Sequence, residues 1–291
     1  MRVALTGATG FIGARVLQVL RERGHDVTAL VRDDAHVSEL EAKGCIPVVV
    51  DLTDRPAVTN VLDKVDAAIH TASPGDATSA NVDAAMVDAA TASYAGSPRP
   101  YVHTSGLWVY GANQAISEQS PLDPPALVAW KQPIEERVLG NAEFRGIVVV
   151  CGTVYGEGGG RTARLLLASP RDDAGNLVML GSGRQHWSTV HAADLADLFV
   201  RIVESESARG RYIAEDGTNP TVADLTRAAA VAAGASGAVP GSDDEARSRL
   251  GGLLADVLLL DQHVVTTRAR DTFDWRPSRP SLVEEFLRGR Y

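Results

Sequence analysis

Several residue types are scarce in this chain, and each scarcity excludes a class of protein. Cys45 and Cys151 are the only cysteines, so a disulfide scaffold or a cysteine-rich metal site is not expected. The net charge is −9, which argues against a nucleic-acid or anionic-membrane partner. No apolar run is long enough to span a bilayer, and a strand pattern stands where a secretory leader would be, so a cytoplasmic location is expected.

Lysine is also scarce, because Lys43, Lys64 and Lys131 are the only three in 291 residues. Any chemistry that needs an ammonium group from lysine is therefore confined to these positions. The rest of the composition, 45% hydrophobic and 22% charged, is ordinary for a globular enzyme. The Ala- and Arg-rich, Lys-poor usage is typical of a GC-rich bacterial genome.

The first half of the chain alternates between apolar strand patterns and helix patterns with short connections. This alternation predicts an α/β fold with a doubly wound parallel sheet of the Rossmann type, in which ligands bind beyond the carboxyl ends of the strands. We expect strands at 2–6, 26–31, 46–50, 66–70, 100–104 and 147–151, and helices at 11–23, 34–43, 54–64 and 81–95. In the second half, Gly and Pro clusters separate helix patterns at 161–168, 192–204, 221–234, 243–256 and 281–288, which predicts a smaller lobe.

The most informative motif follows the first strand and reads Thr6-Gly7-Ala8-Thr9-Gly10-Phe11-Ile12-Gly13. Gly7 allows a tight turn, Gly10 lets backbone N–H groups approach a pyrophosphate, and Gly13 lets the next helix pack closely on the strand. The helix N-terminus adds partial positive charge where the phosphates would sit. We therefore expect dinucleotide binding through Gly7, Thr9, Gly10, Phe11, Ile12 and Gly13.

This loop resembles the TGxxGFIG motif of the extended or atypical short-chain dehydrogenase/reductases, the superfamily of NAD-dependent epimerases and dehydratases. The resemblance continues over most of the chain. It implies a dinucleotide-binding Rossmann domain over 1–155 and a substrate-binding lobe over 156–291, interleaved so that the boundary is approximate. It also implies a small-molecule substrate and a homodimer formed through helices such as 81–95.

The end of the second strand bears on the choice of cofactor. An NAD-selective site usually offers a carboxylate there to the ribose 2′-hydroxyl, whereas an arginine accommodates the 2′-phosphate of NADP. Arg32 stands in this region, although Asp33 and Asp34 follow it and weaken the positive field. We expect NADP(H), with NAD(H) as the alternative.

Two further segments resemble cofactor-binding segments of the family. Asp51 and Leu52 match its DLxD segment, which implies that Asp51 meets the adenine amino group. His70, Thr71 and Ala72 match the strand end under the nicotinamide ribose and diphosphate. A lone histidine needs a partner to act as an acid or base, so a structural role is favoured for His70.

The catalytic centre departs from the family pattern. The family uses a tyrosine whose pKa is lowered by a lysine four residues later, a form of general acid–base catalysis. Lys131 lies in the expected region, and Lys131 to Glu135 mimics the family's KxxxE spacing, but Leu127 replaces the tyrosine. Pro133 disrupts or starts a helix here, so Lys131 is expected just before the helix rather than inside it.

The hydroxyl that orients the substrate is also displaced. Residues 101–111 resemble the family's fifth-strand segment, in which that hydroxyl falls on Gly106, one residue after Ser105 and two after Thr104. Ser105 and Thr104 remain the expected neighbours of the active site, because sites lie at the carboxyl ends of strands. Simple strand-end residues are the alternative.

The substrate side has lost the family's cations. The position four residues before His191, where nucleotide-sugar enzymes carry an arginine for the diphosphate, is Trp187. This loss disfavours a nucleotide-sugar substrate and favours a small, aromatic or polyketide-like one. Tyr155, Trp187, Arg184 and Tyr110 are the expected substrate contacts, with core packing as the alternative for Trp187 and a surface position for Arg184.

Three interpretations follow. In the first, this is an NADPH-dependent, ketoreductase-like enzyme whose proton comes from Lys131, Tyr110, Tyr155 or a water held by Ser105. In the second, hydride goes to an activated acceptor that needs no positioned acid. In the third, the pocket carries out non-redox lyase, cyclase or isomerase chemistry or only binds a ligand; nucleotide-sugar epimerisation or dehydration is a further alternative. The fold does not decide among these. No metal site is expected.

Overall fold

A computed structural model describes all residues from Met1 to Tyr291, and the chain divides into two compact units. The chain passes between the units several times. Unit 1 comprises Met1–Ser105, Trp130–Val150 and Leu195–Tyr212, and unit 2 comprises Gly106–Ala129, Cys151–Asp194 and Ile213–Tyr291. No helix is both long enough and apolar enough to cross a membrane.

A seven-stranded sheet with the strand order β11-β7-β5-β4-β1-β2-β3 forms the centre of the Rossmann-type fold, as the sequence predicted. The pairs β1–β2, β2–β3, β1–β4 and β4–β5 are parallel. The strands are β1 (Arg2–Thr6), β2 (Asp26–Val31), β3 (Ile46–Val49), β4 (Ala67–His70), β5 (Pro100–Gly106), β7 (Arg145–Cys151) and β11 (Gly210–Ala214). All four residues of β4 are buried, which explains why the first three, Ala67 to Ile69, are apolar.

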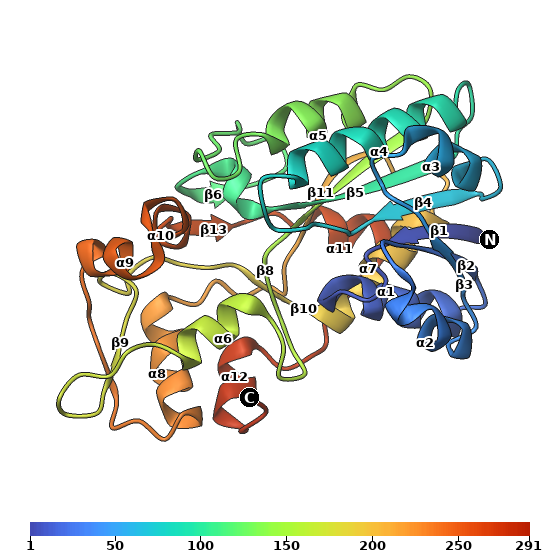
Figure 1. Cartoon of the computed structure of the whole chain (residues 1–291). Helices are drawn as coiled ribbons and strands as arrows, with labels where there is room; N and C mark the ends of the chain where they lie inside the picture. The colour runs from blue at the N-terminus through green and yellow to red at the C-terminus, as the bar shows by residue number, and fades with distance from the viewer. The chain divides into compact units, whose positions relative to one another are not determined.

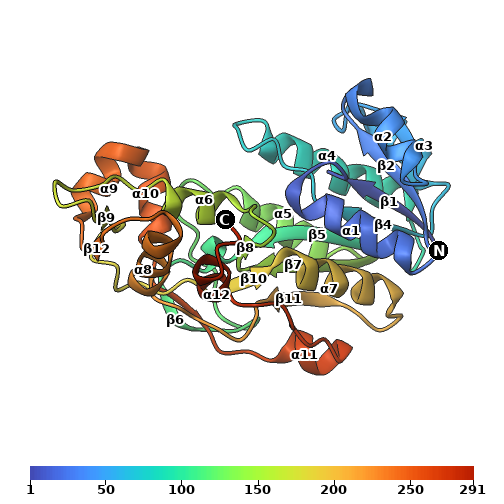
Figure 2. The same ribbon diagram turned by 90° about the horizontal axis from the view of Figure 1, so that it is seen from below.

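Helices cover both faces of this sheet, as Figure 1 shows. On one face lie α3 (Arg55–Leu62), α4 (Ser79–Ser93) and α5 (Lys131–Leu139), and on the other α1 (Phe11–Glu22), α2 (Val37–Ala42) and α7 (Ala192–Glu204). Figure 2 shows α1 and α7 from the side that they share. The side chain of Asp54 accepts a hydrogen bond from the backbone of Ala57 and so caps α3, as expected for this residue type.

Unit 2 has short parallel strand pairs and small helices around its own core. Its strands are β6 (Asn113–Ile116), β8 (Thr153–Tyr155), β9 (Leu177–Val178), β10 (Thr189–His191), β12 (Ala238–Val239) and β13 (Gln262–Val264). Its helices are α6 (Arg161–Leu167), α8 (Val222–Ala232), α9 (Asp243–Leu250), α10 (Gly252–Leu258), α11 (Arg268–Phe273) and α12 (Leu282–Leu287). Capping boxes start α8, α9 and α12, and these helices begin within one residue of the starts predicted at 221, 243 and 281.

Three predicted features need correction. The helix expected over 243–256 is two helices, because Gly251 adopts a φ of +79° between α9 and α10. The segment 34–43 begins as a 3₁₀ turn, Asp34–His36, before α2. Lys131 is the first residue of α5 and not a residue before it; Pro133 is tolerated because the first N–H groups of a helix have no intrahelical partner.

Candidate functional site

The glycine-rich loop between β1 and α1 is closed so tightly that two of its glycines cannot be replaced. Gly7 has a φ of +72°, and a Cβ there would lie 2.8 Å from the backbone nitrogen of Ala72. A Cβ on Gly13 would lie 2.0 Å from the carbonyl oxygen of Gly7. By contrast, a Cβ on Gly10 would meet only that oxygen, at 3.2 Å. The space beside Gly10 is therefore left open by the fold and is not needed for packing.

The N-terminus of α1 fits a phosphate group. Gly10 is its N-cap, so no side chain caps the helix, and its first turn carries no acidic residue. Thr9, Gly10 and Phe11 are exposed, and Ile12 is half-buried. Free N–H groups at a helix start, combined with the positive end of the helix dipole, favour an anion. This end of unit 1 therefore matches the cradle that a dinucleotide needs.

Three polar side chains lie in one row across the neighbouring strands. Thr6 at the end of β1 is in register with His70 on β4, and His70 is in register with His103 on β5. Residues in register on parallel strands project to the same face of a sheet. This face is the one covered by α4, which carries Asp83.

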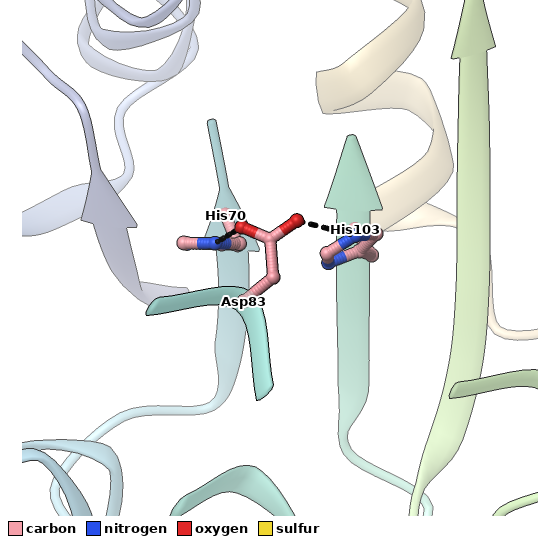
Figure 3. A group of neighbouring side chains, drawn as sticks. All are labelled: His70, Asp83 and His103. Carbon is pink, nitrogen blue, oxygen red and sulfur yellow. Dashed lines mark hydrogen bonds and ion pairs between the residues drawn. The ribbon is translucent and has the colours of Figure 1, made fainter. Parts of the chain in front are cut away.

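Asp83 lies between the two imidazole rings, as Figure 3 shows. Its Oδ1 is 3.0 Å from Nε2 of His70, and its Oδ2 is 3.4 Å from Nε2 of His103. All three side chains are buried, with exposures of 3% or less. Burial alone would raise the pKa of Asp83, but hydrogen bonds from His103 and His70 hold the pKa of this carboxyl well below its usual range. Burial lowers the pKa of His103.

A chain of hydrogen bonds joins this cluster to the glycine-rich loop. The Thr6 hydroxyl is 2.7 Å from Nδ1 of His70 and accepts a hydrogen bond of 3.2 Å from the backbone N–H of Ala72. Thr71 donates its hydroxyl hydrogen to the carbonyl oxygen of Thr6 at 2.7 Å. The three residues predicted under the nicotinamide side of the cofactor, His70, Thr71 and Ala72, therefore hold the start of the loop.

Lys131 completes the cluster from the first position of α5. Its Nζ donates a hydrogen bond to Oδ2 of Asp83 at 3.4 Å and lies 4.4 Å from the centre of the Trp130 ring. The side chain is 17% exposed, against 3% for Asp83. Because a buried charge needs a partner, the ammonium serves as the counter-ion of the carboxylate.

The two predicted hydroxyls are both engaged within unit 1. Ser105 donates to Oε1 of Glu135 at 2.5 Å, and Glu135 is fully buried and paired with Arg211 at 2.7 Å. Thr104 donates to the backbone carbonyl of His70 at 2.7 Å. Glu135, the partner of Ser105, lies one helical turn after Lys131 on α5. Thr104 links β5 to β4.

The residues predicted at the adenosine end lie on the surface of unit 1. Arg32 is 88% exposed, and its Nε is 3.8 Å from the carboxylate of Asp33. Asp51 is exposed and accepts hydrogen bonds from the backbone and hydroxyl of Thr53, which lower the pKa of this carboxyl. Leu52 is half-buried beside it. Neither Asp33 nor Asp51 is held in a buried ion pair.

In unit 2 the structure separates the predicted substrate residues. Tyr155, Trp187 and Tyr110 are buried. The Tyr155 hydroxyl lies 3.0 Å from Asp216, and Trp187 donates its indole N–H to a backbone carbonyl from within the hydrophobic core. Arg184 instead lines a pocket of about 530 Å³ together with Met179, Ser182, Gly183, His186, Thr221, Ala223, Asp224, Arg227, Ala238 and Pro240.

Sequence reasoning gave no role to Asp83 or His103 and noted Glu135 only as part of a spacing. One signal for Asp83 was available: it stands inside an α4 sequence made mostly of Ala, Val and Met, where a carboxylate needs a buried partner. His103 had a weaker signal, because it follows the apolar residue Val102 in the strand but precedes the polar residues Thr104 and Ser105. Neither signal indicates which residue is the partner of Asp83 or of His103.

Known proteins resemble the chain over most of its length. The mouse epimerase family protein SDR39U1 is 30% identical to this chain over 219 residues, which cover 72% of this chain and 73% of the mouse protein. A 3-diazoavenalumate denitrifying reductase of Streptomyces is 28% identical and covers 97% of both chains. The crystal structure of human SDR39U1 with NADPH is 23% identical, has a TM-score of 0.72, and covers 99% of this chain and 98% of its own; it shows the shared fold.

Residues 3–213 match the sequence profile of the NAD dependent epimerase/dehydratase family. The matched range contains the glycine-rich loop, the histidine–aspartate cluster, Lys131 and all seven strands of the central sheet except the first residue of β1 and the last residue of β11. The chain therefore belongs to the NAD dependent epimerase/dehydratase family.

Proposed function

We propose that this protein is an NADPH-dependent oxidoreductase that reduces a small carbonyl-type substrate, with Lys131 as its proton donor. The observation that carries the proposal is the hydrogen-bonded chain Thr6–His70–Asp83–Lys131, which connects the dinucleotide loop to a lysine ammonium. When bound, the nicotinamide supplies hydride. The chain's own residues then have to hold the cofactor, orient the substrate oxygen and deliver a proton to it.

The loop residues perform the first task. Gly10 leaves space at the N-terminus of α1, and Thr71 and Ala72 hold Gly7 in place, so the phosphates would meet backbone N–H groups. Arg32 is the cation available to a 2′-phosphate. The NADPH bound to human SDR39U1 favours NADP(H), whereas the family description names NAD.

Lys131 is the favoured proton donor because the other predicted donors are engaged or buried. Ser105 gives its hydrogen to Glu135, and Thr104 gives its hydrogen to a backbone carbonyl. Tyr110 is buried in unit 2. The Tyr155 hydroxyl is fully buried, and burial raises its pKa well above the usual value. The ammonium of Lys131 is partly exposed and keeps two further N–H donors beside the one that faces Asp83.

The same observation about Ser105 and Thr104 favours a second candidate. An acceptor that is already activated, such as a quinone-like ring or a diazo group, takes hydride without a strongly positioned acid. The Streptomyces relative is named as a reductase of 3-diazoavenalumate, a diazo compound. In this second function Lys131 would stabilise charge on the bound substrate and would not transfer a proton in the slow step.

The test begins with fluorescence titrations of the purified protein with NADPH and, separately, NADH. We expect micromolar binding of NADPH and weaker binding of NADH. A panel of ketones, aldehydes, quinones and aryl diazo compounds is then screened by the loss of NADPH absorbance. Lys131→Ala should lower turnover of a ketone at least tenfold, a modest figure for the loss of one acid–base partner, and should leave turnover of a diazo compound much less affected. If neither NADPH nor NADH binds, the proposal is contradicted.

A further inference from the structure

We propose that Asp83 is a positioning residue that holds the ammonium of Lys131 at the site, with His70 and His103 fixing the carboxylate. The inference rests on the proposed function for what Lys131 does to a substrate, but the pairing itself is a property of the folded protein. It is carried by three contacts to one buried carboxylate from three different elements: β4, β5 and α5.

The hydrogen bonds around Asp83 indicate which of the neighbouring atoms donate. An ionised carboxylate only accepts hydrogen bonds, so His70 presents N–H at Nε2 to Asp83. Nε2 of His103 lies 3.4 Å from the other carboxylate oxygen. Nδ1 of His70 lies 2.7 Å from the Thr6 hydroxyl, whose oxygen is an acceptor for the N–H of Ala72. Burial lowers the pKa of His103, which favours the neutral form of that ring.

His103 also has a polar neighbour at its other ring nitrogen. Its Nδ1 lies 3.5 Å from the hydroxyl of Tyr101, which lies two residues earlier on the same face of β5 and serves as the donor. The groups that face Asp83 are the imidazole rings of His70 from β4 and His103 from β5 and the ammonium of Lys131 from α5. Lys131 supplies the positive charge that balances the carboxylate.

The position of Lys131 in its own helix supports this interpretation. It is the first residue of α5, where the helix dipole disfavours a cation. Neither local helix stability nor solvent exposure explains a lysine there, since the side chain is only 17% exposed. The contact with Asp83 and the Trp130 ring explains it, and this contact holds the ammonium beside the carboxylate that His70 and His103 also face.

A bound divalent cation is the alternative occupant of the cluster, since the ligand atoms of His70, Asp83 and His103 lie within 4.8 Å of one another. A cation would have to displace both ring N–H hydrogens from the carboxylate and sit beside the ammonium of Lys131. In the observed arrangement, His70 and Lys131 form hydrogen bonds with the carboxylate without this repulsion. Metal occupancy is therefore an outcome that the experiment must be able to detect.

The first experiment is a double-mutant cycle on thermal unfolding, which needs no substrate. Lys131→Met leaves the buried carboxylate unbalanced and should lower the unfolding midpoint by about 6 °C. In the Asp83→Asn background the same change should lower it by less than about 2 °C, because no charge is left to balance. Lys131→Arg keeps the charge and should stay within about 2 °C of the wild type.

The chain offers a matched control on the same two helices. Asp88 on α4 pairs with Arg137 on α5, but these side chains are 46% and 43% exposed. Asp88→Asn and Arg137→Met should therefore give nearly additive midpoint changes, since exposed ion pairs contribute little. Equal coupling in the two cycles, or additivity in the Lys131–Asp83 cycle, overturns the inference.

The second experiment separates positioning from structure. Asp83→Asn should lower kcat at least tenfold while the Kd for NADPH and the KM for substrate change less than about twofold. Methylammonium added to Lys131→Ala should restore part of the lost turnover when Asp83 is present and none in the Asp83→Asn background. Equal rescue in both backgrounds contradicts the role of Asp83.

The outcomes distinguish this inference from the proposed function. If no substrate is turned over but the thermal cycle shows coupling, the proposed function fails and the ion pair stands. If turnover is found but the cycle is additive, the positioning role fails and the reductase stands. A stoichiometric metal in the purified protein that is lost in His103→Leu overturns the inference in favour of a metal site.

Discussion

Gly10→Val should abolish nucleotide binding without unfolding the protein, because the fold does not use the space beside Gly10. The backbone there has φ −82° and ψ 171°, which a valine adopts readily. A Cβ would meet only the carbonyl oxygen of Gly7, at 3.2 Å, so a shift of a few tenths of an ångström accommodates it. Replacing glycine by valine at an N-cap destabilises a helix by about 1 kcal/mol.

The effect on binding is larger because the added side chain covers the N–H groups at the start of α1. Hydrogen bonds from backbone N–H groups to a charged phosphate contribute about 1.5–3 kcal/mol each. Losing two of them weakens NADPH binding by a factor on the order of 100 or more. The assay is a fluorescence titration of wild type and variant, with circular dichroism and urea unfolding on the same samples.

Gly13→Ala is the matched control, three residues away in the same motif. Its Cβ would lie 2.0 Å from the carbonyl oxygen of Gly7, so α1 would have to move away from the turn. We expect a loss of at least about 3 kcal/mol of unfolding free energy, in contrast to Gly10→Val. If Gly10→Val binds NADPH as the wild type does, the assignment of the loop is wrong; if it unfolds, the argument from open space is wrong.

Two further predictions concern the surface of unit 1 and the interior of unit 2. Arg32→Ala should weaken NADPH binding about tenfold and leave NADH binding unchanged, because under the proposed function the guanidinium would contact only the 2′-phosphate, which NADH lacks; equal losses for the two nucleotides in parallel titrations would refute this. Burial raises the pKa of Glu215 from 4.5 to about 7 despite its pairing with Arg270, so this residue's contribution to stability is full below pH 4.5 and is lost as the pH rises through 7. Between about pH 4.5 and about pH 8, wild type should lose about 3 kcal/mol more than Glu215→Gln in urea unfolding, and parallel curves for the two proteins would contradict the assignment.

The parts of the fold that depend on neighbours in sequence could be predicted closely. Helix α1 starts where Gly10 and Phe11 indicate, and α3 starts after Asp54, because a cap acts within three residues. The break at Gly251 was not predicted, since a glycine inside a helix pattern signals a break only weakly. The position of Lys131 was misjudged because proline is compatible with both sides of a helix start.

The contacts at the candidate site could not be predicted in the same way. Asp83 meets His70 across 13 residues and Lys131 across 48, and Ser105 meets Glu135 across 30. These contacts depend on strand order and register, which place β4 beside both β1 and β5 and put α4 and α5 on one face. Nothing in the local pattern around Asp83 carries that information.

The sequence by itself determined the dinucleotide loop, the alternation of strands and helices and the absence of the expected tyrosine before Lys131, because each is a short-range pattern of turn, cap and spacing. Only the tertiary structure decided that Ser105 and Thr104 donate their hydroxyl hydrogens to partners inside unit 1, that Tyr155 and Trp187 are buried, and that Lys131 has Asp83 as its partner. The physical reason is that a buried polar group takes whichever partner packing brings within reach, and packing joins residues far apart in the chain.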